Sequence, residues 1–165
     1  QAESQDLCFV PDGDCAAFLA RQRPDLVRPG AIVTLDGREL GTHPGAFRYT
    51  IGQRHGLGLG GGPWYVLRTD LARNEVVVGQ RADLLARAVR LSGFNWVGVE
   101  PTPELAVLAQ LRYNMRPVPA RLRWTDDSNA TLEFAEPVSA VTPGQFAVAY
   151  VGDEVAGGGW IEGGY

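Results

Sequence analysis

Cys8 is the residue of this chain best suited to covalent chemistry. The segments on both sides of it, Ser4–Asp6 and Pro11–Asp14, are polar and turn-forming, as an accessible thiol requires. A reactive cysteine also needs thiolate character from nearby cations or a helix N-terminus, and the neighbouring charges are all acidic. Local chemistry alone therefore favours a half-buried, inert Cys8 over a nucleophile. The other cysteine, Cys15, lies among alanines and is expected to pack; two cysteines are too few for a disulfide framework or a zinc site.

A second polar group lies in Tyr49–Gly56, where Gln53, Arg54 and His55 are consecutive. An amide, a guanidinium and an imidazole side by side can bind phosphate oxygens or base edges. The alternative is a tight turn whose polar side chains are simply solvated. The sequence leaves both interpretations open.

The glycines that follow have the spacing of a dinucleotide-binding motif at Gly56, Gly58 and Gly61. That motif must open a helix, whereas Pro63 and a β-rich run follow here, so this interpretation is rejected. A Walker-type phosphate loop is excluded as well, because the chain contains no lysine.

A third group is Arg112-Tyr113-Asn114-Met115-Arg116, followed by Arg121 and Arg123. Arginine beside tyrosine offers a positive charge and a stacking face, the combination used to bind single-stranded RNA. Alternation along a strand would place half of these side chains on a surface in any case, so a purely structural role is equally open.

The overall charge limits what these groups can do. All 15 basic residues among the 165 are arginine, and the net charge is −4. A dedicated nucleic-acid module is usually basic overall, so any RNA contact must come from a local patch or be shared with another domain. No apolar run approaches the roughly 20 residues of a membrane-spanning helix.

The elements that must position these groups are mostly short strands, since the chain has 21 Gly and 11 Pro. Asp14 is a good N-cap for a short helix over 15–21. Strands are predicted over 31–35 and 38–41, joined by the Asp36-Gly37 turn, and over 64–68 and 75–79.

After Asp83 the apolar runs become regular and have the spacing of a β-barrel. They are 88–96, 108–115, 118–124, 130–134, 146–151 and 157–161. The predicted fold is therefore mainly β, with an active-site cysteine segment (1–17), a small central β-rich domain (18–83) and a six-stranded antiparallel barrel (84–165).

Taken in order, several of these segments resemble one family, the bacterial tRNA-specific 2-thiouridylases. Glu3–Val10 resembles the segment around the family's second catalytic cysteine. The segments that resemble its central domain are 29–33, 41–45 and 49–58, and those that resemble its terminal β-barrel, itself similar to domain 2 of elongation factor Tu, are 141–145 and 157–161. The resemblance covers essentially the whole chain.

The resemblance implies a cytoplasmic sulfurtransferase that performs ATP-dependent 2-thiolation of the wobble uridine of tRNA. Cys8 would accept a persulfide from a sulfur-relay protein or a cysteine desulfurase. The family's PP-loop ATPase domain, which binds ATP with Mg, has no counterpart here, so the chain is expected to be the C-terminal part of the enzyme, to hold no cofactor or metal itself, and to be inactive alone.

The tRNA-binding residues implied by the resemblance are Arg112, Tyr113 and Gln145. Gln53 and Arg54 fit the same role by their chemistry, and no role is implied for Cys15. Two alternatives without catalysis remain open. One is a tRNA-binding β-barrel in which Cys8 is incidental, and the other is a module that docks a sulfur carrier.

Overall fold

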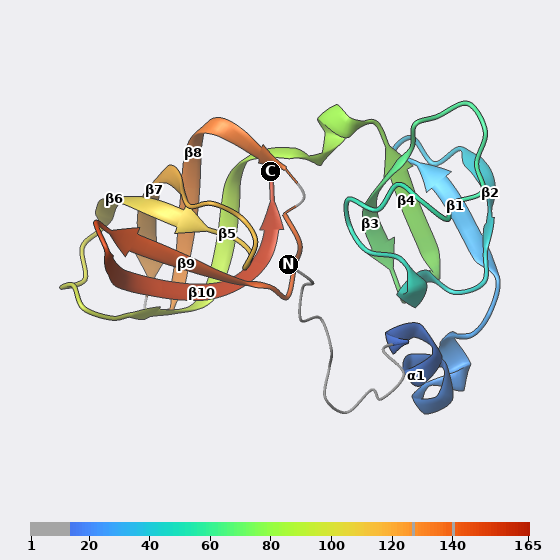
Figure 1. Cartoon of the computed structure of the whole chain (residues 1–165), viewed down its shortest axis with the longest axis horizontal. Helices are drawn as coiled ribbons and strands as arrows, with labels where there is room; N and C mark the ends of the chain where they lie inside the picture. The colour runs from blue at the N-terminus through green and yellow to red at the C-terminus, as the bar shows by residue number, and fades with distance from the viewer. Residues whose placement is uncertain (1–13, 127, 140) are drawn as a thin grey trace. The chain divides into compact units, whose positions relative to one another are not determined.

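The computed structural model describes residues 14–126, 128–139 and 141–165. The chain divides into two compact units, one ending at Arg81 and the other beginning at Ala82 (Figure 1). Both are built mainly of β-strands, which confirms the predicted fold class. We call them the central unit and the barrel. In the described part of the chain, no helix is long and apolar enough to cross a membrane.

The first element in the described part of the central unit is helix α1 (Cys15–Gln22). The Asp14 carboxylate caps it as predicted, accepting a hydrogen bond from the Ala17 backbone N–H at 2.8 Å. The expectation that Cys15 packs was wrong. Cys15 is exposed, because it occupies the first position of a short helix that buries none of its own residues in the described structure.

Four strands form the sheet of the central unit, in the order β2-β1-β4-β3 (Figure 1). They are β1 (Gly30–Thr34), β2 (Glu39–His43), β3 (Tyr65–Asp70) and β4 (Glu75–Gly79). The two predicted antiparallel hairpins, β1–β2 and β3–β4, are joined by parallel pairing of β1 with β4. Among the described residues there are also three short 3₁₀ helices: η1 (Pro24–Leu26) precedes β1, η2 (Ala46–Arg48) lies between β2 and β3, and η3 (Arg81–Leu84) follows β4.

The core of the central unit is small and aliphatic. Ile32, Val66, Val76 and Val78 are fully buried on the sheet. Leu57, buried, and Leu59, partly buried, pack against this core from the glycine-rich loop 56–63, whose other residues are exposed.

A buried polar pair, His43 and Asn74, joins three loops of the central unit. His43 Nδ1 accepts from the Gly45 N–H at 3.0 Å. Asn74 Oδ1 accepts from the Ala46 N–H at 3.2 Å, and its Nδ2 donates to the carbonyls of residues 28 and 29 at 3.0 and 2.9 Å. A Cβ at Gly30 would lie 2.0 Å from the Asn74 carbonyl oxygen, so only glycine fits where these loops meet.

The barrel is closed and antiparallel, with its six strands in the order β10-β5-β8-β7-β6-β9, as predicted in number and type (Figure 1). Closure matters because it leaves no unpaired edge. The strands are β5 (Leu85–Trp96), β6 (Glu104–Gln110), β7 (Val118–Asp126), β8 (Asn129–Ser139), β9 (Phe146–Val151) and β10 (Glu154–Gly164).

Several barrel strands differ from their predicted ranges, and for β6 and β8 the structure shows the physical reason. The strand expected over 108–115 is β6, which begins at Glu104 and ends at Gln110; residues 112–115 form a turn instead, closed by a hydrogen bond from the Met115 N–H to the Arg112 carbonyl. The strand expected over 130–134 continues through Pro137. This proline is tolerated because it lies where the β5–β8 register shifts, so its missing N–H costs no ladder bond there.

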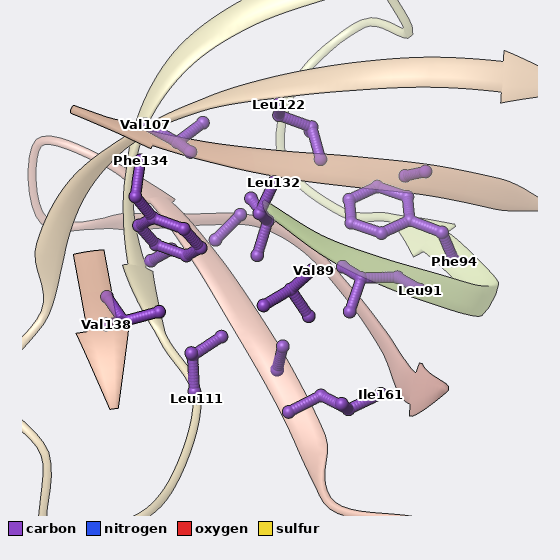
Figure 2. Close-up of a cluster of buried hydrophobic side chains, with 14 residues drawn as sticks. Val89, Leu91, Phe94, Val107, Leu111, Leu122, Leu132, Phe134, Val138 and Ile161 are labelled. Atoms are coloured by element: carbon purple, nitrogen blue, oxygen red, sulfur yellow. The ribbon is translucent and has the colours of Figure 1, made fainter. Parts of the chain in front are cut away.

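The barrel interior is a continuous apolar core (Figure 2). Leu91, Leu122, Leu132 and Ile161 are its largest nearly fully buried side chains, and they come from β5, β7, β8 and β10. In Figure 2 they point toward one another with Phe94 and Phe134. This core fixes the strands, and the strand ends in turn fix the loops that carry the predicted tRNA-binding residues.

Candidate nucleic-acid interface

The predicted site residues fall into three groups. Cys8, the predicted catalytic residue, lies outside the described residues. Gln53 and Arg54 belong to the central unit, and Arg112, Tyr113 and Gln145 to the barrel.

In the central unit, Gln53 holds the loop 50–56 together. Its Oε1 accepts from the Thr50 N–H at 3.1 Å, and its Nε2 donates to the His55 carbonyl at 2.9 Å. The Gln53 carbonyl in turn accepts from the Val66 N–H on β3 at 2.9 Å. The amide chosen by its chemistry as an RNA contact is thus engaged at both ends in shaping its own loop.

Arg54 and His55 are exposed at the tip of this loop. They line an open pocket of about 440 Å³, together with Pro63, Trp64 and the glycine-rich loop. The Trp64 indole N–H donates to the Gly60 carbonyl at 3.0 Å, which folds the glycine loop over the start of β3. Because the loop leads into a strand, it lacks the helix N-terminus that a dinucleotide-phosphate site of the rejected kind requires.

In the barrel, Arg112 and Tyr113 form the tip of the β6–β7 turn. Both are exposed, and Tyr113 retains 94% of its accessible surface. Among the described residues, neither Arg112 nor Arg116 forms an ion pair. The turn therefore presents an uncompensated guanidinium next to an open aromatic face.

Arg121 and Arg123, which the sequence placed with this group, are in a different environment. On the outer face of β7, Arg121 is ion-paired with Glu104, and Arg123 contacts Glu104 at 3.5 Å and Glu133 at 3.1 Å. Two carboxylates thus neutralise two arginines. The structure thus divides the predicted arginine group in two. The arginines of β7 are paired with carboxylates, whereas those of the β6–β7 turn form no ion pair with any described residue.

Gln145 lies in the turn before β9 and is exposed. Gly144, with φ of 84°, allows this turn, and backbone bonds to Ile161 fix it to β10 at both residues 144 and 145. Antiparallel pairing sets Gln110, the last residue of β6, opposite Val148 near the start of β9. The turns that contain Tyr113 and Gln145 therefore leave the barrel at the same end.

Two neighbouring rings of the central unit, His43 and Tyr49, have pKa values shifted by burial. Burial lowers the pKa of His43, outweighing the hydrogen bonds that favour its protonated form. His43 is therefore neutral in the folded central unit near neutral pH, consistent with its Nδ1 accepting a hydrogen bond. Burial also raises the pKa of Tyr49, whose ring lies 5.5 Å from that of His43.

Comparison with known proteins identifies both units. Residues 16–80 match the model of the tRNA methyl transferase PRC-barrel domain, and residues 86–161 match that of the aminomethyltransferase β-barrel domain. The chain is 48% identical over 163 residues to the tRNA-specific 2-thiouridylase MnmA of Magnetococcus marinus, with 96% of the chain and 45% of that protein covered. The chain belongs to the tRNA-specific 2-thiouridylase family.

Other members of the family are similar to a comparable degree. The 2-thiouridylase of Paramagnetospirillum magneticum is 47% identical over 160 residues, covering 96% of this chain and 43% of its own length. That of Geotalea uraniireducens is 45% identical over 165 residues, covering 98% and 44%. The chain thus spans less than half the length of the 2-thiouridylases it matches.

The structure also brings two features to this end of the barrel that the sequence did not single out. Gln110, at the end of β6, forms hydrogen bonds with the Arg112–Tyr113 turn. Phe146, which directly follows Gln145, forms an edge-to-face pair with Trp160 of β10. The two side chains are 44% and 54% exposed. Alternation along β6 and β9 could have shown that Gln110 and Phe146 face outward, but only the strand register shows what lies beside them.

Proposed function

We propose that this chain is the tRNA-contacting part of an enzyme that performs ATP-dependent 2-thiolation of the wobble uridine of tRNA. The observation that carries the proposal is 48% identity to a 2-thiouridylase across nearly the whole chain, both units included. The free Arg112–Tyr113 turn supports it, because an unpaired guanidinium and an open tyrosine ring suit a phosphate and an unstacked base.

In this proposal the barrel binds and orients tRNA. Arg112 neutralises a backbone phosphate of the tRNA, and the Tyr113 ring stacks on a nucleotide. The Gln145 amide, at the same end of the barrel, forms hydrogen bonds with the tRNA. Arg54 of the central unit provides a further phosphate contact, while Gln53 keeps the loop beneath it in shape. Since the net charge of the chain is −4, these few local contacts must act against the electrostatic repulsion between the chain as a whole and the tRNA phosphates.

Cys8 is proposed to carry the sulfur. A persulfide on Cys8 supplies its terminal sulfur to C2 of the uridine, and ATP provides the activation by converting the C2 oxygen into a leaving group that departs with AMP. A second thiol, from a PP-loop domain, then attacks the sulfur of Cys8. This step breaks the bond between the Cys8 sulfur and the sulfur now attached to C2, and so releases the 2-thiouridine. It leaves a disulfide between Cys8 and the second cysteine, which a reductant must reopen.

The proposal is tested by replacing Cys8 in a protein that joins this chain to its PP-loop domain. Cys8→Ser should abolish 2-thiouridine formation, measured by mass spectrometry of tRNA nucleosides, while leaving tRNA affinity unchanged. Cys15→Ser is the matched control and should keep full activity, because that thiol is exposed on α1 and has no role in the proposal.

Two outcomes would contradict this function. Thiolation that persists in Cys8→Ser would exclude the persulfide step and leave a tRNA-binding barrel. Binding of a sulfur-carrier protein without any binding of tRNA would identify a docking module instead.

A further inference from the structure

Gln110 is bonded to the backbone of both residues at the tip of the β6–β7 turn. Its Nε2 donates to the Arg112 carbonyl at 3.2 Å and to the Tyr113 carbonyl at 2.9 Å. One carboxamide NH₂ has two hydrogens, so it can serve both acceptors at once. Two successive peptide planes of the turn are thus fixed by one side chain of the strand.

Tyr150 fixes the orientation of that amide. Its hydroxyl, on the neighbouring strand β9, donates to Gln110 Oε1 at 3.2 Å. The two turn carbonyls can only accept, so the amide nitrogen must face them and the oxygen must face the hydroxyl. The partners leave no ambiguity between the two amide orientations, and they form a hydrogen-bonded path from β9 through Gln110 to the turn.

The side chain of Tyr113, at the tip of the turn, is 94% exposed and is not held by packing. Within the described residues, the backbone bond from Met115 to the Arg112 carbonyl closes the turn, but it leaves the Tyr113 carbonyl to Gln110. A binding group that is already held in its bound conformation loses less conformational entropy when its ligand arrives.

We infer that Gln110, oriented by Tyr150, is a positioning residue that presents Arg112 and Tyr113 to tRNA. The inference rests on the proposed function, because it requires the turn to contact tRNA. Gln110 acts through the backbone of the turn and touches no nucleotide. Its contribution should therefore appear in tRNA affinity and in KM, and leave kcat unchanged.

The main test is Gln110→Met, which keeps the length of the side chain and its neutrality but removes both donors. Loss of the two neutral hydrogen bonds to the turn should weaken tRNA binding by about 3- to 10-fold. Tyr150→Phe should act in the same direction by about 2- to 3-fold, since it only frees the amide to rotate. Leu108→Met is the matched control, because Leu108 is the preceding outward-facing residue of β6 and makes no bond to the turn.

A double-mutant cycle separates positioning from direct contact. In an Arg112→Ala/Tyr113→Ala background, Gln110→Met should have almost no further effect, since there is nothing left to position. An undiminished effect in that background would overturn the inference, and so would a Gln110→Met protein that binds tRNA as the Leu108→Met control does.

The same set of variants distinguishes failure of the inference from failure of the proposed function. If Arg112→Ala/Tyr113→Ala binds tRNA normally, the turn is not a tRNA contact and the inference fails, while the proposed function is decided separately by thiolation in Cys8→Ser. If that variant binds weakly while Gln110→Met binds normally, only the positioning role is lost. Should Gln110→Met unfold, Tyr150→Phe decides the question, because it leaves the backbone bonds of the turn in place.

Discussion

The loop 50–56 of the central unit and the turn 112–115 of the barrel are both held by a glutamine amide, but the amides come from different places. Gln53 belongs to its loop and bonds two residues within it. Gln110 belongs to a barrel strand and bonds a turn outside that strand. The first loop is held in part by a side chain of its own, whereas the second is held in part by side chains of β6 and β9.

The difference teaches that residue type does not reveal which polar side chain binds a ligand and which one builds the site. Gln53 was predicted to contact tRNA, yet its amide is occupied within the loop. The neighbouring Arg54 is exposed beside a pocket and is the better candidate there. In the barrel the same division applies, with Gln110 as support and Arg112 as the exposed charge.

The largest expected effect concerns the barrel arginines. Arg112→Ala should weaken tRNA binding by about tenfold and reduce the slope of log affinity against log salt by about 1, as for one lost phosphate contact. Arg121→Ala is the control on the same strand pair, since Arg121 is already neutralised by Glu104. Filter binding across a salt series measures both, and equal losses from the two variants would mean that the free and compensated arginines do not differ.

A smaller effect is expected from the loop of the central unit. Gln53→Ala removes two hydrogen bonds that shape the loop and should lower the unfolding free energy of the central unit by about 1 kcal/mol. Arg54→Ala, one residue further on, should change it by less than about 0.5 kcal/mol, as is usual for an exposed side chain. Urea unfolding followed by tryptophan fluorescence compares them, and a larger loss from Arg54→Ala would reverse the roles assigned to the two residues.

The smallest effect is a pH dependence of the same unit. Because burial lowers the pKa of His43, the unfolded chain takes up its proton at a higher pH than the folded one. Stability should therefore be complete above the ordinary histidine pKa of about 6.5 and fall as the pH drops below it. His43→Asn should flatten this part of the stability profile, and His55→Asn, at an exposed position, should leave it intact. A profile that His43→Asn does not alter would show that another group is responsible.

Local sequence was enough for much of the fold. Asp14 indicates the start of α1, Asp36-Gly37 indicates the first hairpin, and the six apolar runs after Asp83 predict the barrel strands. These features depend on capping, turn chemistry and alternation, which are encoded within a few residues. The ends of β6 and β8 were predicted less well, because a turn closed by the Met115–Arg112 backbone bond follows β6 and the β5–β8 register shift beside Pro137 allows β8 to continue.

The ordered motifs of the sequence by themselves determined the family, the strand content and the residues to consider for tRNA contact. Only the tertiary structure decided the parallel pairing of β1 with β4, the exposure of Cys15, and the separation of Arg112 from Arg121 and Arg123. The strand pairing and the charge pairing depend on which strands lie side by side and in what register, whereas Cys15 is exposed because α1 buries none of its own residues in the described structure. Cross-strand neighbours decide whether a charge is paired or free, and that cannot be determined from one strand alone.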